Sequence, residues 1–207
     1  MIGKFITLEG GEGVGKSTQL QTLATALRKR GLTVTTTREP GGSAGAEAIR
    51  ALLMQGSEDR WSARAEALLF AAARADHVEK TIRPALFRGE WVLCDRYIDS
   101  SRAYQGGAGG LSDDDILTLH KIGSEGLLPD RTLLLTLPQP DATARTDVRD
   151  QGKPDRFGAK NDEYHQRVIT AFDVMMEREP DRFCSVSGLG NAEDVTARLM
   201  DALGDLL

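Results

Sequence analysis

A glycine-rich run near the start of the chain carries the clearest chemistry. Residues 10–17 read GGEGVGKS and fit the pattern G-x-x-x-x-G-K-[ST], in which backbone N–H groups surround phosphate oxygens. Lys16 adds a charge for the outer phosphates, and the Ser17 hydroxyl can reach Mg²⁺. The run predicts a nucleoside triphosphate site at Gly10, Gly11, Glu12, Gly13, Val14, Gly15, Lys16, Ser17 and Thr18.

Two carboxylates stand at and inside this predicted phosphate loop. Glu9 precedes the glycines and Glu12 lies among them. A carboxylate repels phosphate, so we expect the Glu12 side chain to turn away from the donor phosphates. Glu9 has two interpretations: it reaches the water shell of the metal, or it only fixes the loop.

A second set of candidates follows a short apolar run. In VLCDRY, residues 92–97, Asp95 ends a predicted strand, where ligand groups collect in an open α/β sheet. There Asp95 would order the water around Mg²⁺, and the planar fork of Arg96 would hold a phosphate. A surface ion pair between the two is the alternative interpretation.

The spacing of Phe70 and Arg74 also indicates ligand binding. The two residues are four apart in a segment of helical period, so they share one helix face. An aromatic ring beside a hydrogen-bonding fork is what recognition of a base requires. Taken singly, the phenylalanine is more typical of a core and the arginine of a solvated surface.

The elements that position these residues alternate along the chain. Apolar runs predict strands at 5–8, 33–37, 91–94, 132–137 and 184–186, and helical periodicity predicts helices at 16–30, 46–54, 63–88, 113–124, 140–149, 162–179 and 192–206. This alternation is typical of an α/β fold with a five-stranded, mostly parallel sheet flanked by helices. The length of 207 residues fits one domain.

Two segments break the regular pattern. Pro84 interrupts the long helical stretch and is expected to kink or divide it. Residues 147–161 are rich in charge, contain Gly and Pro, and lack an apolar stripe, so they are expected to form a mobile loop.

Composition excludes several classes of protein. The net charge of −5 and the pI near 5.3 argue against binding nucleic acid through bulk charge. The two cysteines, Cys94 and Cys184, lack the spacing of a zinc site or a disulfide framework. With no signal-length apolar segment before the first motif and no run of membrane-spanning length, we expect a soluble, cytoplasmic protein without a membrane partner.

Five blocks in order give the chain a family resemblance. They are LEGGEGVGKST, REPGGSAGAEAIRALL, LLFAAARADHVEKTIRPAL, DRYIDSSRAYQGG and PDRF, within residues 4–157. The chain resembles the thymidylate kinases through them, and more closely the bacterial members. The resemblance implies a P-loop nucleoside monophosphate kinase fold with a lid at about 147–161. It also implies transfer of phosphate from MgATP to dTMP in dTTP biosynthesis, and a homodimer.

The resemblance assigns the base of dTMP to one group of residues. Phe70 would stack on the thymine ring, and Arg74 and Gln105 would hydrogen-bond its polar edge. Ser101, or the neighbouring Ser100, would approach the base as well.

The resemblance assigns the acceptor phosphate and the sugar to a second group. Arg96 and Arg38 would hold the phosphate in a pocket shaped by Pro40 and the glycines after it. Tyr104 would pack near the 2′ carbon and disfavour a ribose hydroxyl. Glu12 would meet the 3′-hydroxyl. The acceptor phosphate is largely ionised near neutral pH, so no general base is assigned.

The lid departs from the pattern of the bacterial relatives. The phosphate loop contains no arginine, so the lid is expected to supply the catalytic charge from among Arg145, Arg149, Lys153, Arg156 and Lys160. Arg149 is the first choice and Arg156 the second. Relatives commonly carry a glutamate where this chain has Gly158, and Asp162 or Glu163 would have to replace any contact made there.

Three alternative functions remain open at this point. A regulatory GTPase would share the loop, but the Asn-Lys-x-Asp motif that reads guanine is absent. A kinase for another nucleoside monophosphate, or for an unphosphorylated deoxynucleoside, differs only in its acceptor. An inactive nucleotide-binding module is disfavoured, because Lys16, Ser17, Asp95 and Arg96 are all present.

Overall fold

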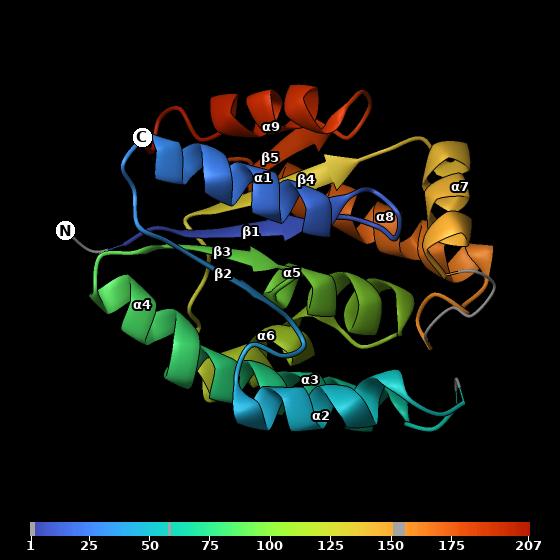
Figure 1. The fold of residues 1–207 in the computed structure, drawn as a ribbon. Helices are drawn as coiled ribbons and strands as arrows, with labels where there is room; N and C mark the ends of the chain where they lie inside the picture. The colour runs from blue at the N-terminus through green and yellow to red at the C-terminus, as the bar shows by residue number, and fades with distance from the viewer. Residues whose placement is uncertain (1–2, 58, 151–155) are drawn as a thin grey trace.

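The fold is built on a parallel β-sheet whose strands all end at one edge (Figure 1). The computed structural model describes residues 3–57, 59–150 and 156–207, without the side chains of residues 147, 149 and 150. Within these residues the sheet has five strands in the order β2-β3-β1-β4-β5. They are β1 (Phe5–Glu9), β2 (Val34–Arg38), β3 (Trp91–Asp95), β4 (Arg131–Thr136) and β5 (Phe183–Ser187). The predicted α/β class and five-stranded parallel sheet are confirmed.

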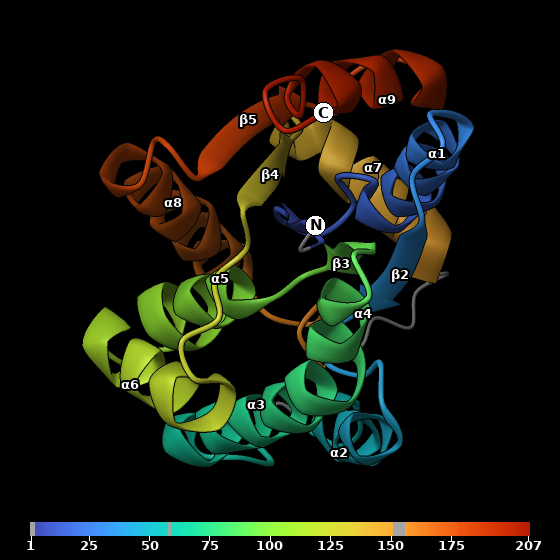
Figure 2. The same ribbon diagram turned by 90° about the vertical axis from the view of Figure 1, so that its left-hand side faces the viewer.

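Helices cover both faces of the sheet, as Figures 1 and 2 show. The helices α1 (Lys16–Lys29) and α9 (Ala192–Asp201) pack on one face over Ile6 and Leu8 of β1. The opposite face contacts α3 (Ala63–His77), α6 (Asp113–Ser124) and α8 (Asp162–Arg178). Because side chains alternate along a strand, Phe5, Thr7 and Glu9 all point to this second face.

Short polar caps begin several helices where the sequence places Ser or Asn. Ser43 caps α2 (Ala44–Met54), Ser62 caps α3, and Asn161 caps α8, each accepting a backbone N–H two or three residues into the helix. Ser112 does the same for α6, which confirms the helix predicted at 113–124 with its three leading aspartates.

The long helical stretch is divided just before Pro84, as expected, although the chain stays helical on both sides. After α3 the chain continues through a π-helical segment, η1 (Val78–Ile82), into α4 (Arg83–Phe87), where Pro84 occupies the first turn. A proline is tolerated there because first-turn N–H groups need no partner within the helix, and the wider π turn re-phases the backbone before it.

Helical structure that the sequence pattern did not predict follows β3. The segment α5 (Ile98–Ser101) leads directly into the π-helical η2 (Arg102–Ala108). Most of its side chains are buried, polar ones included. A stretch with no solvent-facing side has no amphipathic period, so the pattern could not be recognised.

The loop predicted at 147–161 is wrong at its start, where a helix continues to Asp150, whereas residues 156–161 form turns as expected but include buried side chains. The helix α7 (Gln139–Asp150) runs into it, and at its far end Arg156 and Phe157 are buried against α2, α3 and η2. The charge of Arg156 is therefore paired inside the protein. Residues 151–155, which include Lys153, lie outside the described residues.

Among the helices of the described residues, none has the length and apolar character needed to span a membrane.

A buried carboxylate joins β1 to the segment after β3. Glu9 has no exposed surface, and its Oε1 accepts hydrogen bonds from the backbone N–H groups of Tyr97 (2.8 Å) and Ser100 (3.2 Å). Its Oε2 accepts from the Ser100 hydroxyl at 2.6 Å. Burial, with the charge of Asp99, raises the pKa of Glu9 to about 7. This residue fixes α5 to the start of the phosphate loop.

We predict that Glu9→Gln changes how stability depends on pH. The raised pKa means that between about pH 4.5 and 7 the folded protein binds more protons than the unfolded chain, so wild-type stability falls as pH rises through this range. Glutamine keeps the shape without the titration. The variant should gain up to about 3 kcal/mol on the wild type across that window, measured by urea unfolding.

The matched control is Glu90→Gln, a carboxylate at the opposite end of the sheet whose pKa is lowered by the Arg88 side chain. This variant should show no gain over the wild type between pH 5 and 7. Equal pH slopes for Glu9→Gln and wild type would contradict the raised pKa.

Candidate functional site

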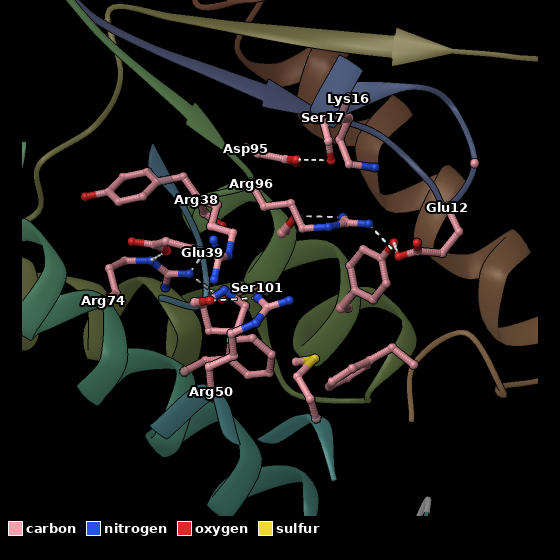
Figure 3. A pocket seen from close by; sticks show the side chains of 18 of the residues that line it. Glu12, Lys16, Ser17, Arg38, Glu39, Arg50, Arg74, Asp95, Arg96 and Ser101 are labelled. Atoms are coloured by element: carbon pink, nitrogen blue, oxygen red, sulfur yellow. Dashed lines mark hydrogen bonds and ion pairs between the residues drawn. The ribbon is translucent and has the colours of Figure 1, made fainter. Parts of the chain in front are cut away.

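A cavity of about 650 Å³ opens at the carboxyl edge of the sheet. Figure 3 shows its side chains converging from the phosphate loop, the end of β3, α2 and α3. All ten residues predicted to bind the acceptor line it, namely Glu12, Arg38, Pro40, Phe70, Arg74, Arg96, Ser100, Ser101, Tyr104 and Gln105. It is lined as well by Gly13, Gly15, Lys16, Ser17, Thr18 and Asp95 of the predicted donor and metal sites.

The phosphate loop has the compact backbone that its glycines predict. Gly15 caps α1 with a left-handed φ of 96°, and a Cβ on Gly13 would lie 2.2 Å from the Ala142 carbonyl oxygen of α7. The Lys16 ammonium folds back onto the loop and donates to the carbonyls of Gly10 (3.1 Å) and Gly11 (2.6 Å). Burial, and then repulsion by Arg96, lowers the pKa of Lys16 to about 8. A phosphate beside it would restore the pKa.

The two groups predicted to hold a metal meet at the loop. The Ser17 hydroxyl donates to Asp95 Oδ2 at 2.6 Å, which joins the first turn of α1 to the end of β3. Oxygen donors of this kind suit Mg²⁺, which retains several waters beside one or two protein oxygens. The described residues contain no group of three or more His, Cys, Asp or Glu side chains able to hold a metal by themselves. The pair therefore fits a metal shared with phosphate.

Glu12 turns away from the loop backbone and toward the acceptor side of the cavity. Its Oε1 lies 2.5 Å from Arg96 Nη2 and accepts from the Tyr104 hydroxyl at 3.3 Å (Figure 3). Arg96 also donates to the Gly10 carbonyl (3.2 Å) and to Ser100 Oγ (3.1 Å), and its guanidinium stacks over the Tyr104 ring at 4.9 Å. The three residues form one cluster between loop and cavity.

Arg96 has an unusual backbone that aims its side chain. Its φ is 67°, in the left-handed region that a non-glycine residue rarely adopts. The conformation is held by the Arg96 N–H, which donates to the Leu8 carbonyl at 3.0 Å, and by the side-chain contacts. Such strain collects at functional sites, where the surrounding structure maintains it.

The far end of the cavity combines aromatic rings with fixed donors. Phe70 packs edge-on against Phe157, with ring centroids 5.7 Å apart. Arg74 is buried and donates to Ser101 Oγ at 2.7 Å. Gln105 donates from its amide nitrogen to Glu66 Oε1 at 2.9 Å, and its side-chain oxygen accepts no hydrogen bond from the residues that the structure describes.

Basic residues line the opening. Arg38 is half exposed and donates to both carboxylate oxygens of Glu47, at 3.0 and 3.1 Å. Arg50 of α2 donates to the Pro40 carbonyl at 2.8 Å and also lines the cavity. The bond from Glu39 to Pro40 is cis.

The lid arginines separate into different roles. Arg145 of α7 lines the cavity and lies over the phosphate loop, 3.7 Å from the position of a Cβ on Gly15. Arg149, the first choice, belongs to the part of α7 whose side chains are not described. Arg156, the second choice, is buried, donates to the Leu53 carbonyl at 3.0 Å and forms an ion pair with Glu66. In this conformation Arg156 supports the aromatic end of the cavity.

Sequence reasoning did not single out several residues that line the cavity, among them Glu39, Arg50, Met54 and Phe157. It named Arg145, which also lines the cavity, only as one of five possible sources of charge in the lid. Glu39 and Arg50 stand inside the block REPGGSAGAEAIRALL, and the helical spacing of its second half was the available signal. Met54 and Phe157 look like ordinary core residues, so nothing in the sequence distinguished them.

A smaller cavity of about 280 Å³ lies on the other side of the phosphate loop, between β4, α7 and α8. Gly158 and Asp162 both line this second cavity. Glu163 pairs with Arg167 on the exposed side of α8 at 3.6 Å. Neither acid lines the larger cavity.

Comparison with known proteins agrees with this geometry. A family model for thymidylate kinase matches residues 8–199. The thymidylate kinase of Rhizorhabdus wittichii is 60% identical over the full length of both chains, and that of Caulobacter vibrioides is 46% identical over 97% of this chain and 96% of its own. The crystal structure of the Ehrlichia chaffeensis thymidylate kinase superposes with a TM-score of 0.78 and 28% identity, covering 98% of this chain and 100% of that one. The chain belongs to the thymidylate kinase family.

Proposed function

We propose that this protein transfers the terminal phosphate of ATP to dTMP, giving ADP and dTDP in the synthesis of dTTP. The observation that carries the proposal is the single cavity in which all ten predicted acceptor residues meet the phosphate loop. A donor bound at the loop and an acceptor in this cavity would bring the two phosphates together. Family membership supports the same reaction.

The residues would act by alignment and charge neutralisation. Lys16 and the loop N–H groups hold the donor phosphates, and Arg96 and Arg38 hold the acceptor phosphate. The acceptor oxygen is already ionised near neutral pH, so no base has to remove a proton. Arg145 is the described lid residue best placed to approach the transferred phosphate, with Arg149 one turn further along α7.

The metal and acceptor contacts follow the same logic. Ser17 and Asp95 would hold Mg²⁺, which when bound neutralises phosphate charge. Both carboxylate oxygens of Glu9 already accept hydrogen bonds from Tyr97 and Ser100. Any effect of Glu9 on the metal would therefore be indirect, through these two residues. Phe70 would stack on the thymine, with Arg74, Gln105 and Ser101 at its edge.

Assembly, location and lid movement belong to the same proposal. We propose a cytoplasmic homodimer of single-domain subunits, each with a lid at about residues 147–161. The exposed side chains of Leu68 on α3 and Ile122 on α6, 56% and 77% accessible, support a partner on these adjacent helices.

We predict that dTMP supports the fastest turnover among nucleoside monophosphates and nucleosides. ADP formation from ATP would be measured against dTMP, dCMP, dAMP, dGMP and thymidine. The control Lys16→Ala should lose nearly all turnover with every acceptor while remaining folded by circular dichroism. Strongest turnover with dCMP or thymidine would refute the proposed acceptor, and full activity of a folded Lys16→Ala would remove the loop from the mechanism.

We predict that Phe70→Ala weakens the binding of dTMP. Loss of a stacked ring costs about 1–3 kcal/mol, which corresponds to a rise of roughly five- to hundred-fold in the KM for dTMP. The KM for ATP should stay within about twofold, because the donor binds at the loop. Steady-state kinetics with each substrate varied would decide, and equal changes in both KM values would contradict stacking.

We predict that Glu12→Ala lowers turnover with dTMP more than with 3′-deoxy-dTMP. The carboxylate faces the acceptor side and would accept a hydrogen bond from the 3′-hydroxyl, an interaction the analogue lacks. A cycle of two enzymes and two substrates isolates that contact. Equal losses with both substrates would exclude it and leave Glu12 only as the partner of Arg96.

A further inference from the structure

A continuous row of buried polar side chains stands behind the cavity wall at Arg74. Thr37 Oγ1 lies 2.7 Å from His77 Nε2, and His77 Nδ1 lies 2.9 Å from Glu39 Oε1. The other oxygen of Glu39 accepts from Arg74 Nε at 2.7 Å. Glu39, Arg74 and His77 are at most 5% exposed, so water does not compete for these bonds.

The row fixes the orientation of the Arg74 guanidinium. Its Nε is held by Glu39, and its Nη2 donates to Ser101 Oγ at 2.7 Å and to the Tyr97 carbonyl at 3.2 Å (Figure 3). Within the described part of the chain, Arg74 Nη1 makes no hydrogen bond. The atom is nevertheless not completely buried. Nη1 is therefore the donor that remains accessible in the cavity that Arg74 lines.

Charge keeps the row in one arrangement. Burial by itself would raise the pKa of Glu39, but Arg74 and His77 outweigh it and lower the pKa. An ionised carboxylate only accepts hydrogen bonds. His77 Nδ1–H must then donate to Glu39, while Nε2 contacts the Thr37 hydroxyl. Every member of the row has its partner.

Two sequence blocks build this row. Arg74 and His77 are three apart on α3, so both reach the same carboxylate. Glu39 is held on its backbone, because its N–H donates to the Asp95 carbonyl at 2.9 Å. A Cβ on Gly42 would lie 2.4 Å from both His77 Nε2 and Thr37 Oγ1, so only glycine leaves room for their bond. The segments REPGG and ARADH, far apart in the sequence, thus form one hydrogen-bonded row.

We propose that Glu39, supported by His77, is a positioning residue that holds Arg74 as a fixed donor and thereby sets the preference for thymine over cytosine. The inference rests on the proposed place of Arg74 at the base edge. Thymine carries an acceptor, O4, where cytosine carries the N4 amino donor. A guanidinium in a fixed orientation donates a hydrogen bond to O4 of thymine. With cytosine the same guanidinium would face the N4 amino group, which is also a donor.

The decisive variant is Glu39→Gln, which keeps the shape and removes the charge. We expect the KM for dTMP to rise about tenfold, since Arg74 loses its ion pair with Glu39 and is held less firmly. The inhibition constant of dCMP should not rise, because cytosine never used the fixed donor. The kcat and the KM for ATP should stay within about twofold. His77→Gln, which spares the bond from Arg74 to Glu39, should show the same pattern at about threefold.

The matched control is Glu179→Gln. Glu179 also accepts from two cationic side chains, Arg102 Nη1 and Arg182 Nη2, both at 2.6 Å, but it does not line the cavity. This variant should lose stability without changing the ratio of dCMP to dTMP affinity. A general collapse of the pocket would weaken dTMP and dCMP equally, and that result in a folded Glu39→Gln would overturn the proposal.

Arg74→Ala separates this inference from the proposed function. If Arg74→Ala leaves the KM for dTMP unchanged, the place of Arg74 at the base is wrong and the inference fails with it. If Arg74→Ala raises that KM and Glu39→Gln does not, Arg74 is held by Ser101 and Tyr97 alone and only the inference fails. Should Glu39→Gln not fold, an unchanged dCMP to dTMP ratio in His77→Gln overturns the proposal.

Discussion

The site depends on the buried carboxylate of Glu9, which ties the strand before the phosphate loop to the segment after β3. A charge at that depth is costly, and the pKa of Glu9 stays raised to about 7, so the three hydrogen bonds from Tyr97 and Ser100 offset only part of the cost. These bonds fix α5, and with it the residues that follow in the same block. The donor loop and a large part of the acceptor cavity are therefore one rigid unit.

Arg96 occupies the junction of that unit. Its left-handed backbone, its bond to the Gly10 carbonyl and its pair with Glu12 hold one guanidinium between the phosphate loop and the cavity. A residue in such a conformation needs support from every side. Glu9 provides part of it indirectly, because Ser100 bonds both Glu9 and Arg96.

Carboxylates inside an anion-binding cavity have a common explanation in these contacts. Three cavity arginines have acidic partners, since Arg38 contacts Glu47, Arg74 contacts Glu39, and Arg96 contacts Glu12. The pairs of Arg38 and Arg96 are at least partly exposed, so a phosphate can exchange for the carboxylate at modest cost. The pair of Arg74 is fully buried and would be costly to break, so it acts as structure. Burial thus separates the two arginines proposed to bind the acceptor phosphate from the one proposed to present a fixed donor.

Much of this protein follows from its sequence alone. The glycine spacing, the alternation of short apolar runs with helical periods, and Asp95 at the end of a strand are local patterns, and local patterns fix element type and the edge where ligands collect. They located the phosphate loop and the five parallel strands, and they singled out Glu12, Phe70, Arg74 and Arg96 among the residues that line the cavity. The family resemblance supplied the other proposed acceptor residues and the separate role of each.

Only the tertiary structure decided which polar groups pair with one another. The burial of Arg156, the bonds of Glu9 to Tyr97 and Ser100, and the row from Thr37 to Arg74 join residues 35 to 103 positions apart. The helical α5 and η2 have no solvent-facing period. Sequence spacing does not encode such contacts, because they depend on how the strands and helices pack against one another in the folded protein. Arg156 is an example. Its charged sequence neighbourhood is typical of a solvated loop, but in the folded protein Glu66 and the Leu53 carbonyl lie beside it and bind its side chain.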